Sequence, residues 1–209
     1  MTRMPNLETE RLIIRPFALS DLDAIHRIID LEQADAETGT AGAQTREQRR
    51  TWLEWSVLNY DQLAWMYQPP YGDRAIVLKS SGELIGACGY TPATGPFGLL
   101  PALRGNEELA SARRFTPEFG LYWQIGLAHQ RKGYASEAAR ALIDYAFAHL
   151  NLKRIIATTE HSNHASIGVM RRVGMHIETN PESEPPWFQV VGIRWNDAAQ
   201  QADAPDVVQ

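Results

Sequence analysis

Hydrophobic positions in the N-terminal part of the chain fall into one strand-like run and two helical patterns. The strand is expected over residues 7–15. Apolar residues at the spacing of one helix face then predict a helix over residues 21–31, for which Ser20 is a suitable N-cap. A small, polar stretch at 33–44 is typical of a loop, and a second helix is predicted over about 45–63.

The middle of the chain carries strand-like runs separated by turn residues. Residues 74–79 and 84–90 are two such runs, and the residues between them have the turn chemistry of a hairpin. Residues 91–115 contain three prolines, three glycines and no strand alternation, so we interpret them as an inserted loop beside the substrate cleft. The fourth strand of the chain is expected over 118–127.

The C-terminal part continues with alternating helices and strands. An apolar face at helical spacing predicts a helix over 136–150, and β-forming residues predict a strand over 153–159. The next helix opens at Asn163, a plausible N-cap, and stops at Gly174. The two final strands are expected at 175–179 and 187–195.

This order of elements predicts a mixed α/β (α+β) fold in which helices pack on a central, mostly antiparallel sheet. With 209 residues, 44% of them hydrophobic, the chain is long enough for one domain with a sizeable core. We expect that domain to cover residues 1–196. The tail at 197–209 is polar and poor in large apolar groups, which predicts disorder.

Charge and cysteine content narrow the classes of partner. The net charge of −5 and a pI of about 5.7 make nucleic acid a poor partner, because phosphate backbones are bound by clustered basic residues. The single cysteine, Cys88, excludes an intrachain disulfide and argues against a thiolate metal site. The chain shows neither a signal peptide nor an apolar run of about 20 residues, so a cytoplasmic protein without a membrane segment is expected.

The most informative stretch is Gln130-Arg131-Lys132-Gly133-Tyr134-Ala135, which lies between a predicted strand and a predicted helix. A short loop at a helix N-terminus directs several backbone N–H groups and the positive end of the helix dipole to one point. Gly133 allows close backbone approach, because it has no Cβ. Such a loop suits a pyrophosphate, although an ordinary polar turn is the alternative for the bare motif.

The hexapeptide fits the pattern Q/R-x-x-G-x-G/A and resembles the acyl-CoA loop of the GNAT superfamily of N-acetyltransferases. Two further stretches are similar to that family in the right order. Residues 7–17 resemble the first strand of the branch that includes the N-terminal acetyltransferases of ribosomal proteins (Rim type). The stretch from Asn163 to Met175 is similar to the family's Asn-x-x-Ser helix, which ends in Gly and a bulky apolar residue.

The resemblance implies the GNAT fold, in which the fourth and fifth strands splay apart to admit the pantetheine arm of acetyl-CoA. The fourth strand corresponds to 118–127 and the fifth to 153–159. Backbone groups of Ile125 and Leu127 would then meet the acetyl and pantetheine groups, and Asn163 would touch the pantetheine arm. The expected cofactor-binding residues are Ile125, Leu127, Gln130, Arg131, Lys132, Gly133, Tyr134, Ala135, Ser136, Asn163 and Ser166.

Acetyl transfer to an amine needs a base, an oxyanion donor and a proton for the leaving thiolate. The resemblance points to Glu118 as the base, acting through water, although a solvated strand-end carboxylate is the simpler interpretation. The N–H of Ile125 is the oxyanion candidate. Weaker rivals for the base are Glu178, Glu182, His161 and His164.

Ser166 is the candidate acid, since it matches the Ser of Asn-x-x-Ser. Many family members place a Tyr four residues before the helix-ending Gly, but this chain has Met170 there, which cannot donate a proton. Tyr122 and Tyr134 are reserve donors that packing explains equally well. A serine that only bonds the backbone is the alternative for Ser166.

The leading interpretation is an acetyl-CoA-dependent N-acetyltransferase that needs no metal and acts on a protein α-amine or a small-molecule amine by direct attack in a ternary complex. A homodimer is left open. The second interpretation is a GNAT scaffold that binds acyl-CoA and senses it without turnover, which Met170 leaves open. A nucleotide-phosphate enzyme is weaker, because neither glycine-rich nucleotide motif is present.

Overall fold

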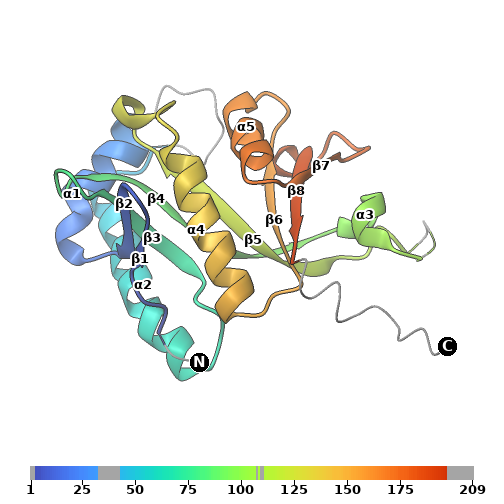
Figure 1. The fold of residues 1–209 in the computed structure, drawn as a ribbon, viewed down its shortest axis with the longest axis horizontal. Coiled ribbons are helices and arrows are strands. Elements are labelled where there is room, and N and C mark those ends of the chain that lie inside the picture. The colour runs from blue at the N-terminus through green and yellow to red at the C-terminus, as the bar shows by residue number, and fades with distance from the viewer. Residues whose placement is uncertain (1–2, 33–42, 107, 109–110, 197–209) are drawn as a thin grey trace. The chain divides into compact units, whose positions relative to one another are not determined.

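The structure of the protein is a computed structural model, which Figure 1 shows as a ribbon. It describes residues 3–32, 43–106, 108 and 111–196. The predicted tail and nearly all of the predicted loop at 33–44 lie outside the described residues. Two compact units are present: the first lies within Met1–Thr91 and Leu121–Leu142, and the second within Pro92–Gly120 and Ile143–Gln209.

Three elements contribute residues to both units, namely β4, β5 and α4. The elements that begin in the first unit are β1 (Leu7–Glu8), β2 (Leu12–Pro16), a 3-10 turn (Leu19–Asp21), α1 (Leu22–His26), a π turn (Arg27–Leu31), α2 (Arg46–Trp65), β3 (Gly72–Leu78), β4 (Leu84–Gly95), a 3-10 turn (Leu127–His129) and α4 (Tyr134–His149). Those that begin in the second are a 3-10 turn (Phe97–Leu99), α3 (Pro101–Arg104), β5 (Thr116–Ile125), β6 (Arg154–Thr159), α5 (His164–Arg172), β7 (His176–Thr179), a 3-10 turn (Pro186–Phe188) and β8 (Val190–Trp195).

The first strand is a hairpin, so the prediction of one continuous strand over 7–15 is wrong. β1 and β2 pair antiparallel, with Leu7 opposite Ile14. Thr9 closes the turn between them: its N–H donates to the Leu12 carbonyl at 3.0 Å, and its hydroxyl accepts from the Leu12 N–H at 2.9 Å. A threonine side chain that bonds the local backbone favours a turn over an extended strand.

The first helix, α1, begins at Leu22 and has Asp21 as its N-cap, so the predicted N-cap role of Ser20 is wrong. The Asp21 carboxylate accepts the Ala18 N–H at 2.8 Å and pairs with both terminal nitrogens of Arg15 at 2.7 and 2.8 Å. Burial alone would raise the pKa of Asp21, but these donors hold it below its usual value. A charged acceptor with three donors therefore outcompetes a neutral hydroxyl.

The second helix and the following hairpin are confirmed. Thr45 and Gln48 form a reciprocal capping box, in which each side chain accepts the other's backbone N–H at 3.3 and 2.9 Å. β3 and β4 then pair antiparallel, with Ala75 opposite Ala87. Gly82 adopts a φ of +72° in the turn between them.

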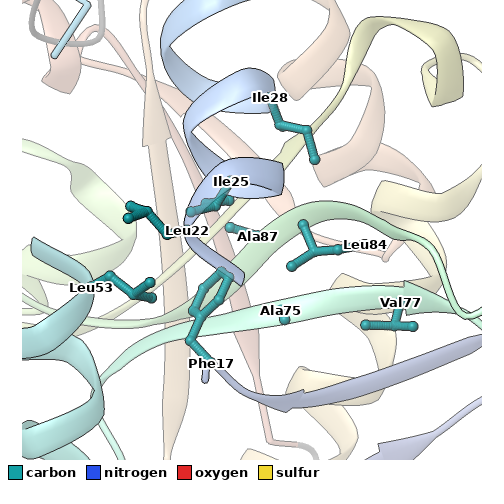
Figure 2. Packing of buried hydrophobic residues seen from close by; sticks show 9 residues of the cluster. All are labelled: Phe17, Leu22, Ile25, Ile28, Leu53, Ala75, Val77, Leu84 and Ala87. Atoms are coloured by element: carbon teal, nitrogen blue, oxygen red, sulfur yellow. The ribbon is translucent and has the colours of Figure 1, made fainter. Parts of the chain in front are cut away.

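Helices cover both faces of the sheet in the first unit. On one face the N-terminal helix and α2 pack on strand residues in a buried cluster, drawn in Figure 2: Phe17, Leu22, Ile25, Ile28, Leu53, Ala75, Val77, Leu84 and Ala87. Tyr90 lies three residues after Ala87, so its side chain points to the opposite face. There its hydroxyl donates to the Leu142 carbonyl of α4 at 2.5 Å.

The sheet of the second unit has the strand order β5-β6-β8-β7. β8 pairs antiparallel with both β6 and β7, whereas β5 runs parallel to β6. The sheet is thus mostly antiparallel, as predicted. The register of β5 against β6 is limited to Gly120 opposite Ile156 among the described residues, which fits the predicted splay of these two strands.

The segment predicted as an inserted loop is part of the core of the second unit. β4 continues through it to Gly95, and short helical turns follow. Phe97, Leu99 and Leu100 are buried with Ile156 and Ile193, so they cover one face of the sheet. The prediction of a loop without regular structure is wrong because these apolar residues lack the period of a helix or strand.

Candidate functional site

The 130–136 loop joins the end of β5, through a 3-10 turn (Leu127–His129), to the start of α4. Arg131 has a φ of +59° and Gly133 a φ of +86°, so two left-handed residues flank Lys132, and the preceding Gln130 is extended. Left-handed residues in a short turn direct nearby N–H groups to one side, as in an anion-binding concavity. The loop is exposed up to Gly133.

The N–H groups of this loop are available to a ligand. The first helical bond runs from the Glu137 N–H to the Gly133 carbonyl at 3.0 Å. Within the described part of the chain, the N–H groups of residues 131–136 donate to no oxygen. They coincide with the positive end of the α4 dipole, so the loop has the chemistry of a phosphate site.

The side chains of the motif hold the loop as much as they line it. The Gln130 amide donates to the Ile125 carbonyl at 3.0 Å, which ties the loop to the end of β5. The Lys132 ammonium donates to the Ala128 carbonyl at 2.7 Å. Arg131 is exposed and stays a predicted phosphate contact.

A contact network from the N-terminal hairpin fixes the first turn of α4. Glu137 accepts the Thr9 hydroxyl at 2.5 Å, the Arg11 N–H at 2.9 Å and the Arg11 Nε at 2.7 Å. Burial would raise the pKa of Glu137, but these donors keep it below its usual value. Sequence reasoning missed the roles of Arg11 and Glu137. The available signal was Glu137 itself, because an acidic residue next to a predicted anion site needs a cationic partner.

Two hydroxyl-bearing residues complete this end of α4. Ser136 is buried, and its hydroxyl has no partner among the described residues. The Tyr134 ring lies under the Arg11 guanidinium, 4.5 Å from ring centroid to Cζ. This cation–π contact gives Tyr134 a packing role, in line with the alternative considered for it.

The end of β5 places Ile125 and Leu127 next to the loop. Ile125 is buried, and its carbonyl receives the Gln130 amide. The Leu127 N–H donates to Glu32 Oε2 at 3.0 Å, so Glu32 occupies a backbone donor that the resemblance assigns to pantetheine. Glu32 is a further residue that sequence reasoning missed, since nothing in its local pattern marks it.

Glu118 lies in the second unit, where Arg154 engages both of its carboxylate oxygens. The Arg154 Nε donates at 2.8 Å and its terminal nitrogen makes a second, shorter contact. The Glu118 side chain is 6% exposed. Hydrogen bonding to Glu118 raises the pKa of Arg154. This geometry favours a structural ion pair, and the role of Glu118 as a base stays a prediction.

Asn163 is confirmed as the N-cap of α5, because its Oδ1 accepts the Ser166 N–H at 3.0 Å. No hydrogen bond of the Ser166 hydroxyl to a described residue is present, Ser166 is partly exposed, and its role as the acid stays a prediction. Met170 is 1% exposed and packs against Gly192, within 3.0 Å of the position that a Cβ would take there. The position of the usual Tyr is therefore part of the core.

Two of the four rival bases, Glu178 and Glu182, are engaged elsewhere in the second unit. Glu178 accepts the Ala102 N–H at 3.0 Å, and Glu182 pairs with Arg113 at 2.6 Å. A cavity of about 270 Å³ opens against α5, lined in part by His161, His164 and Arg171. Arg171 brings a positive charge to this lining, which favours an anionic or neutral ligand over an ammonium group.

The predicted site residues thus fall into two groups. The loop residues, Ile125 and Leu127 are brought together in the first unit, while Glu118, Asn163 and Ser166 lie in the second. Among the described residues no group of three or more His, Cys, Asp or Glu side chains could hold a metal. In the same residues no helix is long and apolar enough to cross a membrane.

Known proteins resemble this chain over most of its length. The uncharacterized N-acetyltransferase p20 of Bacillus licheniformis is 27% identical over 175 residues, which cover 84% of this chain and 84% of p20. An acetyltransferase structure from Agrobacterium tumefaciens is 27% identical, with a TM-score of 0.64 over 93% of this chain and 96% of that one.

The fold is also that of RimL, a ribosomal L7/L12 α-N-protein acetyltransferase solved with coenzyme A. Its TM-score is 0.65 at 16% identity, over 93% of this chain and 99% of RimL. The model of the acetyltransferase (GNAT) domain matches residues 11–176, most of the chain. The predicted family and fold class are confirmed, and the chain belongs to the GNAT family of acetyltransferases.

Proposed function

We propose that the protein transfers the acetyl group of acetyl-CoA to a primary amine. One observation carries the proposal: the 130–136 loop presents six N–H groups without described acceptors at the N-terminus of a sixteen-residue helix. A pyrophosphate offers two charged groups at the spacing of such a concavity. Membership of the GNAT family and the coenzyme A complex of RimL support this ligand.

In the proposed reaction the neutral amine nitrogen attacks the thioester carbonyl. A C–N bond forms, the C–S bond breaks, and CoA leaves with the electron pair of that bond. One proton leaves the amine, and one proton is gained by the thiolate. We assign the second transfer to the Ser166 hydroxyl and the oxyanion contact to the Ile125 N–H. Glu118 could accept the first proton only after release from Arg154, so water is the simpler acceptor.

The acceptor class is a protein α-amine or a small primary amine. An α-amine has a pKa near ~8, so part of it is neutral at physiological pH and a weak base suffices. A lysine-type amine, near ~10.4, needs more assistance. An α-amine acceptor would therefore need the least help from a base on the protein.

The alternative is a module that binds acyl-CoA without turnover. It is supported by Met170, which is buried where many family members have a proton-donating Tyr. The two functions share the loop and differ only in chemistry. Release of CoA that depends on an added amine supports the enzyme, while tight binding without release supports the sensor.

The loop assignment is tested by titrating CoA into wild type, Gly133→Val and Gly82→Val. Both glycines have left-handed φ angles, but only Gly133 lies in the loop, so Gly82→Val controls for backbone strain. We expect Gly133→Val to lose most CoA affinity and Gly82→Val to retain it. Equal affinity of the Gly133→Val variant and wild type would remove the pyrophosphate from this loop.

A further inference from the structure

Glu137 places a negative charge in the first turn of α4, directly beside the proposed pyrophosphate site. A carboxylate stabilises a free helix N-terminus, but it also repels an anionic ligand there. A pyrophosphate can therefore bind well at the start of α4 only when another group neutralises the charge of Glu137. The residue that meets Glu137 is Arg11, 126 positions away in the sequence.

The Arg11 side chain contacts three residues of the loop and of the first turn of α4. Its Nε and Nη2 both approach Glu137 Oε2, at 2.7 and 2.6 Å. Its Nη1 donates to the Lys132 carbonyl at 3.1 Å, and the guanidinium stacks on the Tyr134 ring. The planar fork of arginine allows these contacts at once, which a lysine ammonium cannot reproduce.

The same side chain reaches the glycine on which the loop depends. Arg11 Nη2 lies 3.3 Å from the position that a Cβ on Gly133 would occupy. The Arg11 side chain is 42% exposed, whereas that of Glu137 is 17% exposed. Arg11 thus keeps part of its side chain open to solvent and also lies beside Gly133 of the loop.

We propose that Arg11 is a positioning residue for acyl-CoA: it holds the 130–136 loop in its anion-binding conformation and cancels the charge of Glu137. The inference rests on the proposed function. Orienting the Lys132 carbonyl away from the ligand turns the neighbouring N–H groups toward it. The N-terminal hairpin, whose turn contains Thr9 and Arg11, thereby becomes part of the cofactor site.

The experiment compares two acetyl donors in wild type and Arg11→Ala. Acetyl-CoA carries the pyrophosphate, and acetyl-pantetheine lacks it. With acetyl-CoA we expect the KM of Arg11→Ala to rise about 10- to 100-fold with kcat little changed, because an unpaired carboxylate then faces the diphosphate. With acetyl-pantetheine the variant should match wild type, which a general loss of structure would not allow.

Second variants separate charge from geometry. Glu137→Gln in the Arg11→Ala background should recover much of the acetyl-CoA KM, because it removes the repelling charge. Arg11→Lys should be intermediate, and it serves if Arg11→Ala does not fold. Arg46→Ala is the matched control: Arg46 also bonds a carboxylate, Asp23, at 2.7 Å in the first unit, and its loss should change neither donor's KM.

Two results would overturn the role of Arg11 without touching the proposed function. One is an unchanged KM for acetyl-CoA in Arg11→Ala, and the other is an equal rise in KM for acetyl-CoA and acetyl-pantetheine. Titration of wild type with CoA distinguishes this from failure of the proposed function. If wild type does not bind CoA, the proposed function falls and the role of Arg11 falls with it.

Discussion

Asp73, at the start of β3, shows how a single residue can cost stability. Burial raises the pKa of its carboxyl group to about 6, despite the opposing charge of Arg49. The unfolded chain has a pKa near ~3.9 at this residue, so the folded state binds more protons between about pH 4 and 6. The contribution of Asp73 to the unfolding free energy therefore falls as pH rises through that window.

Asp73→Asn should consequently stabilise the protein at neutral pH. Raising the pKa of Asp73 from ~3.9 to about 6 costs at most ~3 kcal/mol of unfolding free energy. We expect Asp73→Asn to recover about 1–3 kcal/mol at pH 7.5 and much less at pH 4. Urea unfolding at the two pH values measures this difference. Asp61→Asn, at an exposed aspartate, is the control. A loss of stability at pH 7.5 would show that the charged form of Asp73 is satisfied.

Ser166 allows a test of the proposed acid. Loss of its hydroxyl removes the donor to the thiolate but leaves the Asn163 cap intact, since that cap uses the Ser166 N–H. Ser166→Ala should lower kcat by one or two orders of magnitude, about 1.4–2.7 kcal/mol, with the KM for acetyl-CoA little changed. A kcat equal to wild type, where chemistry limits the rate, would make Ser166 structural.

Glu118 is expected to contribute chiefly to stability. Glu118→Gln leaves Arg154 without its charged partner in a half-buried pair, at a cost of about 1–3 kcal/mol after allowance for solvent. Thermal unfolding and a pH–rate profile of the same variant separate the two roles. A stable variant whose turnover fell most at low pH would instead return Glu118 to the mechanism as the base.

At the scale of elements, α5 positions Ser166 by packing tightly on β8. A Cβ added to Gly192 would lie 2.9 Å from the Met175 sulfur and 3.0 Å from that of Met170. Gly192→Ala should therefore cost about 1–3 kcal/mol of unfolding free energy by overpacking.

Gly168→Ala, on α5 itself, is the matched substitution for Gly192→Ala on β8. A Cβ there meets only Arg172 Nη1, at 3.9 Å, so Ala should stabilise the helix by about 0.5–1 kcal/mol. Urea unfolding measures both variants. The packing account would be refuted if the two substitutions had the same sign.

Sequence periodicity predicted elements with a regular apolar face, such as α4, in which Ala139, Leu142, Ile143 and Ala146 are buried as predicted. It failed where a side chain redirected the backbone: Thr9 folded one predicted strand into a hairpin, and Asp21 replaced Ser20 at a helix start. The core role of the segment that contains Phe97 was also missed, because burial there follows tertiary packing without a period.

The loop of the candidate site could be predicted, since its glycine and its place before a helix are local features. The pairing of Arg11 with Glu137 could not, because residues 126 positions apart meet only in the folded chain. The partner of Glu118 was hidden for the same reason: Arg154 lies on a different strand.

At the scale of the whole molecule, the two units share β4, β5 and α4. Loss of structure in one unit removes residues of these elements from the other, so we expect one cooperative unfolding transition, as in a single domain. Hydrogen exchange in increasing urea should show β3 and β8 losing protection at the same midpoint. Separate midpoints would mean that the units unfold independently.

The central claim, that this chain moves an acetyl group from CoA to an amine, is tested most directly by product analysis. Wild-type protein is incubated with acetyl-CoA and a panel of peptides with free α-amines and small primary amines, and products are identified by mass spectrometry. We predict one added acetyl group on an amine nitrogen, with release of one equivalent of CoA and with loss of both signals in Gly133→Val. CoA binding without an acetylated product across the whole panel would contradict the claim and favour the acyl-CoA sensor.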